Sequence, residues 1–138
     1  LTLDHLARLK NFKKFIPYFD IPFQHCSEKI LRRMGRFYDG AHIRRMLDFI
    51  RAEFPQSIIR TSFIIGFPGE TQEEFDELLE FVKIYKFESI GLFEYHDEPL
   101  AASSRLDEKV SSEEISSRRT IIGSVIDSIY ADIAAKEK

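Results

Sequence analysis

The stretch SIIRTSFIIGF, residues 57–67, decides the fold. It is rich in β-branched and aromatic residues and apolar almost throughout, which is typical of a parallel strand covered by helices. A Pro-Gly pair follows directly and predicts a turn. Thr71 and Glu74 then have the spacing of a capping box, so a helix is expected to begin there and to run to about Tyr85. The sequence therefore predicts a strand, a turn and a helix.

Further strands and helices are expected on either side of this unit. Strands are predicted at residues 16–24 and 88–95. Apolar spacing predicts helices over residues 1–12, 27–34 (with Ser27 as the N-cap), 41–54 and 113–135. This order implies crossover connections, so the fold class is α/β with three parallel βα units. Three open strands leave unpaired edges and one poorly covered face, which indicates that the chain belongs to something larger.

The composition excludes several classes of protein. Hydrophobic residues make up 43% and charged residues 31%, which argues against disorder. The net charge of −3 gives no overall nucleic-acid signal, and we interpret a local run of basic residues between positions 29 and 45 as a solvated helix surface. The single cysteine, Cys26, allows no disulfide within the chain, and no apolar run is long enough to span a membrane. We expect a cytoplasmic location, and a start without Met indicates a processed or engineered piece.

Polar or glycine-rich residues stand at the carboxyl end of each predicted strand, which is where sites gather in α/β folds. These strand ends are residues 23–26 (FQHC), 66–70 (GFPGE) and 93–96 (FEYH). On physical grounds alone, the glycine-rich segment is a plain turn with a capping box, because the Gly-Lys-Ser/Thr end of a phosphate-binding loop is missing.

The residues near these strand ends differ in how well they suit a functional site. Adjacent strand residues point to opposite faces, so we interpret Cys26 as a small buried residue and regard His25 as the better site candidate. No CxxC or HxxxH spacing is present, so no metal site is predicted. Arg60 and Ser62 share one face of the central strand. Arg60 either reaches water at the entry of the sheet or meets a carboxylate inside a site, and both readings stay open.

Three blocks of this sequence resemble the radical-SAM methylthiotransferases, in the order and at the spacing of that family. The first block spans residues 18–36, beginning YFDIPFQH and ending at Arg36. The second is residues 60–71 (RTSFIIGFPGET), and the third is residues 93–101, beginning FEY. Together they extend the resemblance over nearly the whole chain.

The family has one branch that acts on an isopentenylated adenosine beside the tRNA anticodon and another that acts on an aspartate of a small-subunit ribosomal protein. Residues 20–25 (DIPFQH) and 60–63 (RTSF) resemble the ribosomal-protein branch, because the tRNA branch typically reads LPxQSGS and TDIIVG there. Residues 96–100 (HDEPL) depart from the SPEEGT-like loop usual in the former branch. The resemblance therefore does not extend to the substrate contacts of this loop.

The resemblance implies that residues 1–138 are the C-terminal half of a (βα)6 radical-SAM barrel, a partial TIM-type barrel. It implies S-adenosyl-L-methionine (SAM) and 4Fe-4S clusters as cofactors of the parent protein, with a CxxxCxxC loop, a second cluster domain and a TRAM domain that are absent here. Because Cys26 alone cannot supply three thiolates, this piece is expected to bind no cluster and to be inactive by itself. The residues expected to form one wall of the SAM site are Gln24, His25, Arg60, Ser62, Gly66, Phe67 and Tyr95.

Within this wall, the resemblance suggests Gly66 and Phe67 near the adenine and Tyr95 near the radical path. Arg36 is expected either to pair with an anion or to cap a helix end. A half-barrel exposes apolar surface, so self-association through the open sheet edge or face is expected. Two alternatives to the ribosomal-protein reading are a tRNA-modifying enzyme of the same family and a non-redox module that binds a small ligand at the strand ends near Gln24, Gly66 and Tyr95.

Overall fold

The computed structural model describes residues 2–11, 17–36, 39–98, 100–101 and 105–136. Within them, three parallel strands form one sheet in the order β1 (Tyr18–Asp20), β2 (Ile58–Ile65) and β3 (Ser89–Glu94). The helices are α1 (Leu3–Leu9), α2 (Glu28–Arg33), α3 (Gly40–Glu53), α4 (Gln72–Tyr85) and α5 (Ser112–Lys136). The expected α/β class with three parallel βα units is confirmed.

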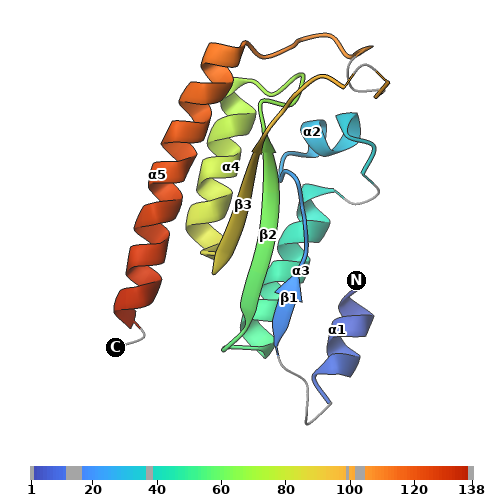
Figure 1. Cartoon of the computed structure of the whole chain (residues 1–138). Helices are drawn as coiled ribbons and strands as arrows, with labels where there is room; N and C mark the ends of the chain where they lie inside the picture. The colour runs from blue at the N-terminus through green and yellow to red at the C-terminus, as the bar shows by residue number, and fades with distance from the viewer. Residues whose placement is uncertain (1, 12–16, 37–38, 99, 102–104, 137–138) are drawn as a thin grey trace.

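The crossover helices α3 and α4 lie on the same face of the sheet, and α5 packs beside α4 (Figure 1). Burial alternates along β2 because the helices cover only one face of the sheet. Every second side chain from Ile59 to Ile65 is buried, while Ile58 and Arg60 on the opposite face are exposed. Single-sided cover of this kind suits a section of a barrel, where the helices form the outer layer.

The core between the sheet and these helices is built around aromatic rings. Phe23, Phe63, Phe81 and Phe87 are all fully buried or nearly so. Their neighbouring ring centroids lie 5.6 to 6.4 Å apart, mostly edge to face or tilted, which are favourable geometries for aromatic pairs. These rings come from the segment after β1, from β2, from α4 and from the turn before β3, so the cluster packs α4 against the middle of the sheet.

The first strand is shorter than predicted. After Asp20 the chain passes through Pro22, which has no N–H to donate to the sheet, and pairing resumes only at the isolated bridge between Gln24 and Phe63. Gln24 has a positive φ of 70°, so the backbone turns sharply where the strand was expected to end. The predicted helix and strand ends at Leu1, Phe12 and Ile16 lie outside the described residues.

The two predicted N-caps differ in their chemistry. The capping box before α4 is formed, since Glu74 accepts a hydrogen bond from the Thr71 backbone N–H at 2.8 Å. Ser27 does precede α2, but its side chain makes no capping hydrogen bond, so that expectation was wrong in detail. The backbone N–H of Ser27 itself donates to Nδ1 of the buried His25 at 3.0 Å.

The face of the sheet away from α3 and α4 carries large apolar side chains that are open to solvent. Tyr18 is 48% exposed, Ile58 46% and Phe93 59%. The expectation of one poorly covered sheet face is therefore confirmed. Within the described residues, no helix has the length and apolar character needed to cross a membrane.

Candidate functional site

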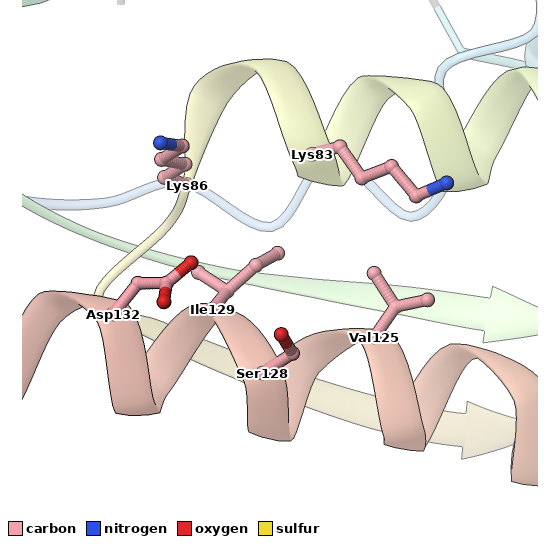
Figure 2. Close-up of a pocket in the computed structure, with 6 residues that line it drawn as sticks. All are labelled: Lys83, Lys86, Val125, Ser128, Ile129 and Asp132. Carbon is pink, nitrogen blue, oxygen red and sulfur yellow. The ribbon is translucent and has the colours of Figure 1, made fainter.

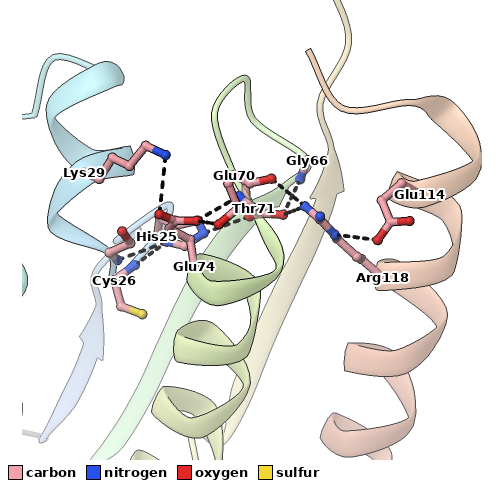
Figure 3. Close-up of polar contacts among 10 residues, drawn as sticks. His25, Cys26, Lys29, Gly66, Glu70, Thr71, Glu74, Glu114 and Arg118 are labelled. Atoms are coloured by element: carbon pink, nitrogen blue, oxygen red, sulfur yellow. Dashed lines mark hydrogen bonds and ion pairs between the residues drawn. The ribbon is translucent and has the colours of Figure 1, made fainter. Parts of the chain in front are cut away.

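The loops that follow the three strands meet at the carboxyl edge of the sheet, where the sequence predicts a site. Residues 24–27 and 66–71 are joined there by buried polar side chains (Figure 3). Residues 95–97 adjoin them through an aromatic contact. The predicted site residues fall into two groups, one buried beneath this edge and one on the open face of the sheet.

His25 is fully buried, and both of its ring nitrogens are engaged. Nδ1 accepts hydrogen bonds from the backbone N–H groups of Cys26 and Ser27, each at 3.0 Å. Nε2 lies 2.8 Å from Oε2 of Glu70. Because Nδ1 acts as an acceptor, the ring proton is on Nε2, and a neutral imidazole donates to the carboxylate. His25 is thus placed behind the open face, where it fixes the shape of the first loop.

Glu70 is the centre of this buried network, with 3% of its surface exposed. Its Oε1 accepts hydrogen bonds from the Gly66 N–H at 3.1 Å and from Nη1 of Arg118 at 2.8 Å, while Oε2 faces His25. The Glu70 carbonyl accepts a further bond from Arg118 at 2.9 Å. A buried carboxylate is costly unless it is paired and hydrogen-bonded, and here it is both. Glu70 therefore joins the first two loops to α5.

The two glycines of the second loop adapt it to its protein neighbours. Gly66 has φ +82°, and a Cβ there would lie 2.2 Å from the Ile115 side chain of α5. Gly69 has φ +96°, and a Cβ there would lie 2.6 Å from Nε of Arg33. The Gly69 N–H donates to the carbonyl of Glu108 at 2.9 Å. The interpretation of this segment as a turn agrees with this geometry, because its glycines are used for close packing within the chain.

The second group lies on the open face. Arg60 is exposed there, in register with Asp20 of β1 and Ser89 of β3, as the reading in which it reaches water predicts. The reading in which it meets a carboxylate inside a site stays a prediction. Ser62 is half-buried on the same face, two residues along. The backbone N–H of Gln24 donates to the Ser62 carbonyl at 2.9 Å, which brings these two predicted site residues together.

Phe67 and Tyr95 form an edge-to-face pair, with ring centroids 5.4 Å apart. The Tyr95 hydroxyl donates to Asp97 at 2.7 Å, and the ammonium of Lys109 lies 5.7 Å from the Tyr95 ring centroid. Hydrogen bonds from Lys109 and Tyr95 lower the pKa of the Asp97 carboxyl. The structure therefore joins Phe67 and Tyr95 and attaches the third loop to the segment before α5.

Arg36 stands apart from the other predicted site residues, at the end of α2. Its backbone N–H donates to the Leu31 carbonyl at 3.0 Å, and the N–H of Gly35 donates to the Arg32 carbonyl at 3.0 Å. With Gly35 at φ +75°, this is a Schellman motif. Of the two roles expected for Arg36, the backbone performs the helix-capping one.

The comparisons with known proteins agree with the resemblance drawn from the three sequence blocks. The family model described as "Radical SAM superfamily" matches residues 1–82. The chain belongs to the radical SAM superfamily. It is similar to the ribosomal protein uS12 methylthiotransferase RimO of Thermotoga maritima, with 43% identity over 113 residues, which are 82% of this chain and 26% of that protein. It is 38% identical to RimO of Dictyoglomus thermophilum over 136 residues, which are 99% of this chain and 31% of that protein.

This radical-SAM chain therefore spans between a quarter and a third of the length of these two curated relatives. Among solved structures, it is similar to coproporphyrinogen III oxidase (HemN) from Escherichia coli, a radical SAM enzyme, with a TM-score of 0.65 and 20% identity. The match covers 89% of this chain and 29% of that one. At this identity the likeness concerns the fold, and it supports the expected section of a barrel.

The open face fits one side of a SAM molecule. Gly91 has no side chain on this face, and a Cβ there would make ordinary van der Waals contacts, at 3.6 Å with Cβ of Ser62 and 3.4 Å with the Phe93 ring. Ser62 is the neighbour of Gly91 in the sheet, and Arg60 lies two residues earlier on the same strand face; a hydroxyl and a guanidinium are groups suited to the polar and anionic parts of SAM.

An iron–sulfur cluster does not fit the residues present. Cys26 is fully buried, and burial above all raises the pKa of its thiol to about 12. Within the described ranges, no group of three or more His, Cys, Asp or Glu residues is arranged to hold a metal ion. A radical-SAM cluster would need its thiolates from elsewhere.

Two pockets flank α5, and they differ in their relation to the carboxyl edge. Figure 2 shows a pocket of about 300 Å³ between the C-terminal part of α4 and α5, lined by Lys83, Lys86, Val125, Ser128, Ile129 and Asp132. Because α4 begins at the carboxyl edge, this pocket lies at the far end of the helices from the site. A second, of about 430 Å³, lies at the edge beside Thr71, Lys109 and Arg118.

Sequence reasoning missed Glu70 and Arg118 as members of the site region. Glu70 was visible as part of the second sequence block but was assigned only to a turn. Arg118 lies three residues after Ile115 and four before Ile122, so it occupies a position on the apolar stripe of α5. A charged residue at such a position signals a buried partner, and this signal was available in the sequence.

Replacing Gly66 with alanine is expected to lower the free energy of unfolding by at least about 2 kcal/mol, because a side chain would be strained at φ +82° and would collide with Ile115. Gly123→Ala is the matched control. Gly123 lies inside α5, and a Cβ there would have nothing within 4 Å. The Gly123→Ala substitution should therefore raise the free energy of unfolding by about 0.5–1 kcal/mol. Urea unfolding followed by circular dichroism measures both, and wild-type stability of the Gly66→Ala protein would contradict the loop geometry.

Cys26 is expected to resist alkylation in the folded chain at pH 8, because its pKa is raised to about 12 and its side chain is buried. Unfolding in urea should make labelling by iodoacetamide fast, since an unfolded thiol has a pKa of about 8.5. As pH rises, the Cys26 thiol therefore loses its proton in the unfolded state before it does so in the folded state. The free energy of unfolding should fall as pH rises from about 8.5 to about 12. Equal labelling rates in the folded and unfolded chain would exclude a buried thiol.

Proposed function

We propose that residues 1–138 form the C-terminal half of a radical-SAM catalytic domain, in a methylthiotransferase that modifies an aspartate of ribosomal protein uS12 in the cytoplasm. The observation that carries this proposal is the similarity to RimO proteins, which reaches 43% identity over 82% of the chain. The sheet face left open on the side away from α3 and α4 supports it, because a barrel places its ligands inside the ring of helices.

In this proposal the described residues form one wall of the SAM site. Arg60 would pair with the carboxylate of SAM, and Ser62 and Gln24 would donate hydrogen bonds beside it. Phe67 and Tyr95 would provide an aromatic boundary at the edge, with Gly66 and His25 shaping the backbone beneath. SAM, when bound with the parent's iron–sulfur clusters, supplies the radical and methyl chemistry, and this wall binds it, orients it and excludes water.

A protein substrate is favoured over RNA by the charge of the third loop. Asp97, which pairs with Lys109, is exposed, as are His96 and Glu98 beside it. Carboxylates at this edge would repel the phosphates of tRNA, whereas they would attract the basic side chains of a ribosomal protein. The loop's departure from the usual family sequence thus leaves its acidic character intact, and we assign it to the contact with the substrate protein.

The full-length protein that carries these residues tests the proposal. After anaerobic reconstitution with iron and sulfide, and with a one-electron reductant added, it should bind SAM, release 5′-deoxyadenosine and methylthiolate a uS12 peptide, while residues 1–138 alone should do none of these. Ser62→Leu should weaken SAM binding at least about tenfold, because the new side chain fills the space beside Gly91. Ser124→Leu, an exposed position on α5, is the matched control.

Each outcome of this experiment has a different meaning. Modification of tRNA in place of the peptide would assign the protein to the other branch of the family. Binding of a small ligand without any cluster or SAM cleavage would support the non-redox module. If the Ser62→Leu protein binds SAM with unchanged affinity, the open face of the sheet is not part of the SAM site.

We also propose that residues 1–138 self-associate when they are separated from the rest of the protein. The exposed side chains of Tyr18, Ile58 and Phe93 lie on one sheet face, and burial of this face against a second copy would remove them from water. Sedimentation velocity should show a dimer or larger species, and Phe93→Ser should shift the distribution toward monomer. A monomer at high concentration would contradict the proposal.

A further inference from the structure

The guanidinium of Arg118 reaches from α5 into the buried network at the carboxyl edge. We propose that Arg118 is a positioning residue for the SAM-binding wall, acting through Glu70 and His25; this inference rests on the function proposed above. Arg118 is only 5% exposed, and its position on α5 lies outside all three sequence blocks that carry the resemblance. Its hydrogen bonds within the described residues are with Glu70 and Glu114, neither of which lies on the open face, so its influence on that face passes through other groups.

The first link joins α5 to the second loop. Nη1 of Arg118 donates to both the side-chain Oε1 and the backbone carbonyl of Glu70, at 2.8 and 2.9 Å. Its Nε donates to Glu114 one turn earlier at 3.2 Å, and its guanidinium carbon lies 5.6 Å from the Phe75 ring centroid. The guanidinium is therefore fixed from several sides, and it fixes both the backbone and the carboxylate of Glu70 (Figure 3).

The second link runs from Glu70 to the loop that carries Gln24. Glu70 can accept from His25 and from the Gly66 N–H at the same time only while its carboxylate keeps one orientation. His25 in turn accepts the backbone N–H groups of Cys26 and Ser27 on Nδ1. These amides lie two and three residues after Gln24, so the orientation of Glu70 determines the backbone conformation of the loop that carries Gln24.

Removing the positive charge of Arg118 would interrupt this series of contacts at its first member. Glu70 would be left as a buried carboxylate without its cation, and such a group either takes up a proton or turns toward water. Turning toward water takes the acceptor away from the His25 ring, and protonation weakens it by removing the charge of the carboxylate. Lysine at position 118 would keep the charge but could not reproduce the guanidinium geometry that serves Glu70 and Glu114 together.

The test uses the full-length protein and two measurements. Equilibrium dialysis gives the Kd for SAM, and hydrogen–deuterium exchange with mass spectrometry follows the amides of residues 24–27. Arg118→Met should raise the Kd roughly tenfold and speed exchange at Cys26 and Ser27, while exchange in α3 stays at the wild-type rate. Arg118→Lys should lie between this variant and wild type. Arg45→Met, an exposed arginine of α3, should match wild type.

The two measurements separate this inference from the proposed function. If wild-type protein binds no SAM, the proposed function fails, and the exchange data alone then decide whether Arg118 positions the first loop. Wild-type exchange at Cys26 and Ser27 in the Arg118→Met protein would overturn the inference, as would an unchanged Kd. If Arg118→Met does not fold, the same readouts on Arg118→Lys and on the double variant Glu70→Gln/Arg118→Met decide it, since the double variant leaves no unpaired buried charge.

Discussion

The structure depends on one constraint of parallel sheets. Each connection must run from the carboxyl end of one strand, across a face of the sheet, to the amino end of the next strand. Here α3 and α4 both cross on the same face, and the aromatic cluster around Phe63 fills the space between them and the strands. One face of the sheet is thereby used for folding, and the other is left free. The candidate binding groups of β2, Arg60 and Ser62, alternate with the residues that build the core.

Much of this fold could be predicted because its signals are local. Residues 57–67 have the composition of a covered parallel strand, and the Thr71–Glu74 spacing marks the start of α4. The end of β1 was harder to predict, because the prolines that exclude a helix also interrupt the pairing of a strand. Residue type and position predict Ser27 as the N-cap of α2, and Ser27 does stand there, but they do not determine whether its hydroxyl accepts a hydrogen bond.

The candidate site was predicted less well, because its residues differ in role while lying close in sequence. Gln24 and His25 are neighbours, yet one is half-buried beside the open face and the other is wholly interior. A sequence block places both positions in the site region. It does not show which side chain faces the open side of the sheet and which one holds the loop from within. The partner that explains the burial of His25 is Glu70, and the cation that explains Glu70 comes from α5, so the network depends on long-range contacts.

The backbone at Gln24 has a consequence for how this sequence can change. A φ of 70° costs a residue with a side chain about 1–2 kcal/mol, and glycine would adopt it freely. Drift toward greater stability would therefore tend to replace this glutamine with glycine. A chain that keeps the longer residue gives up stability to retain an amide at this point.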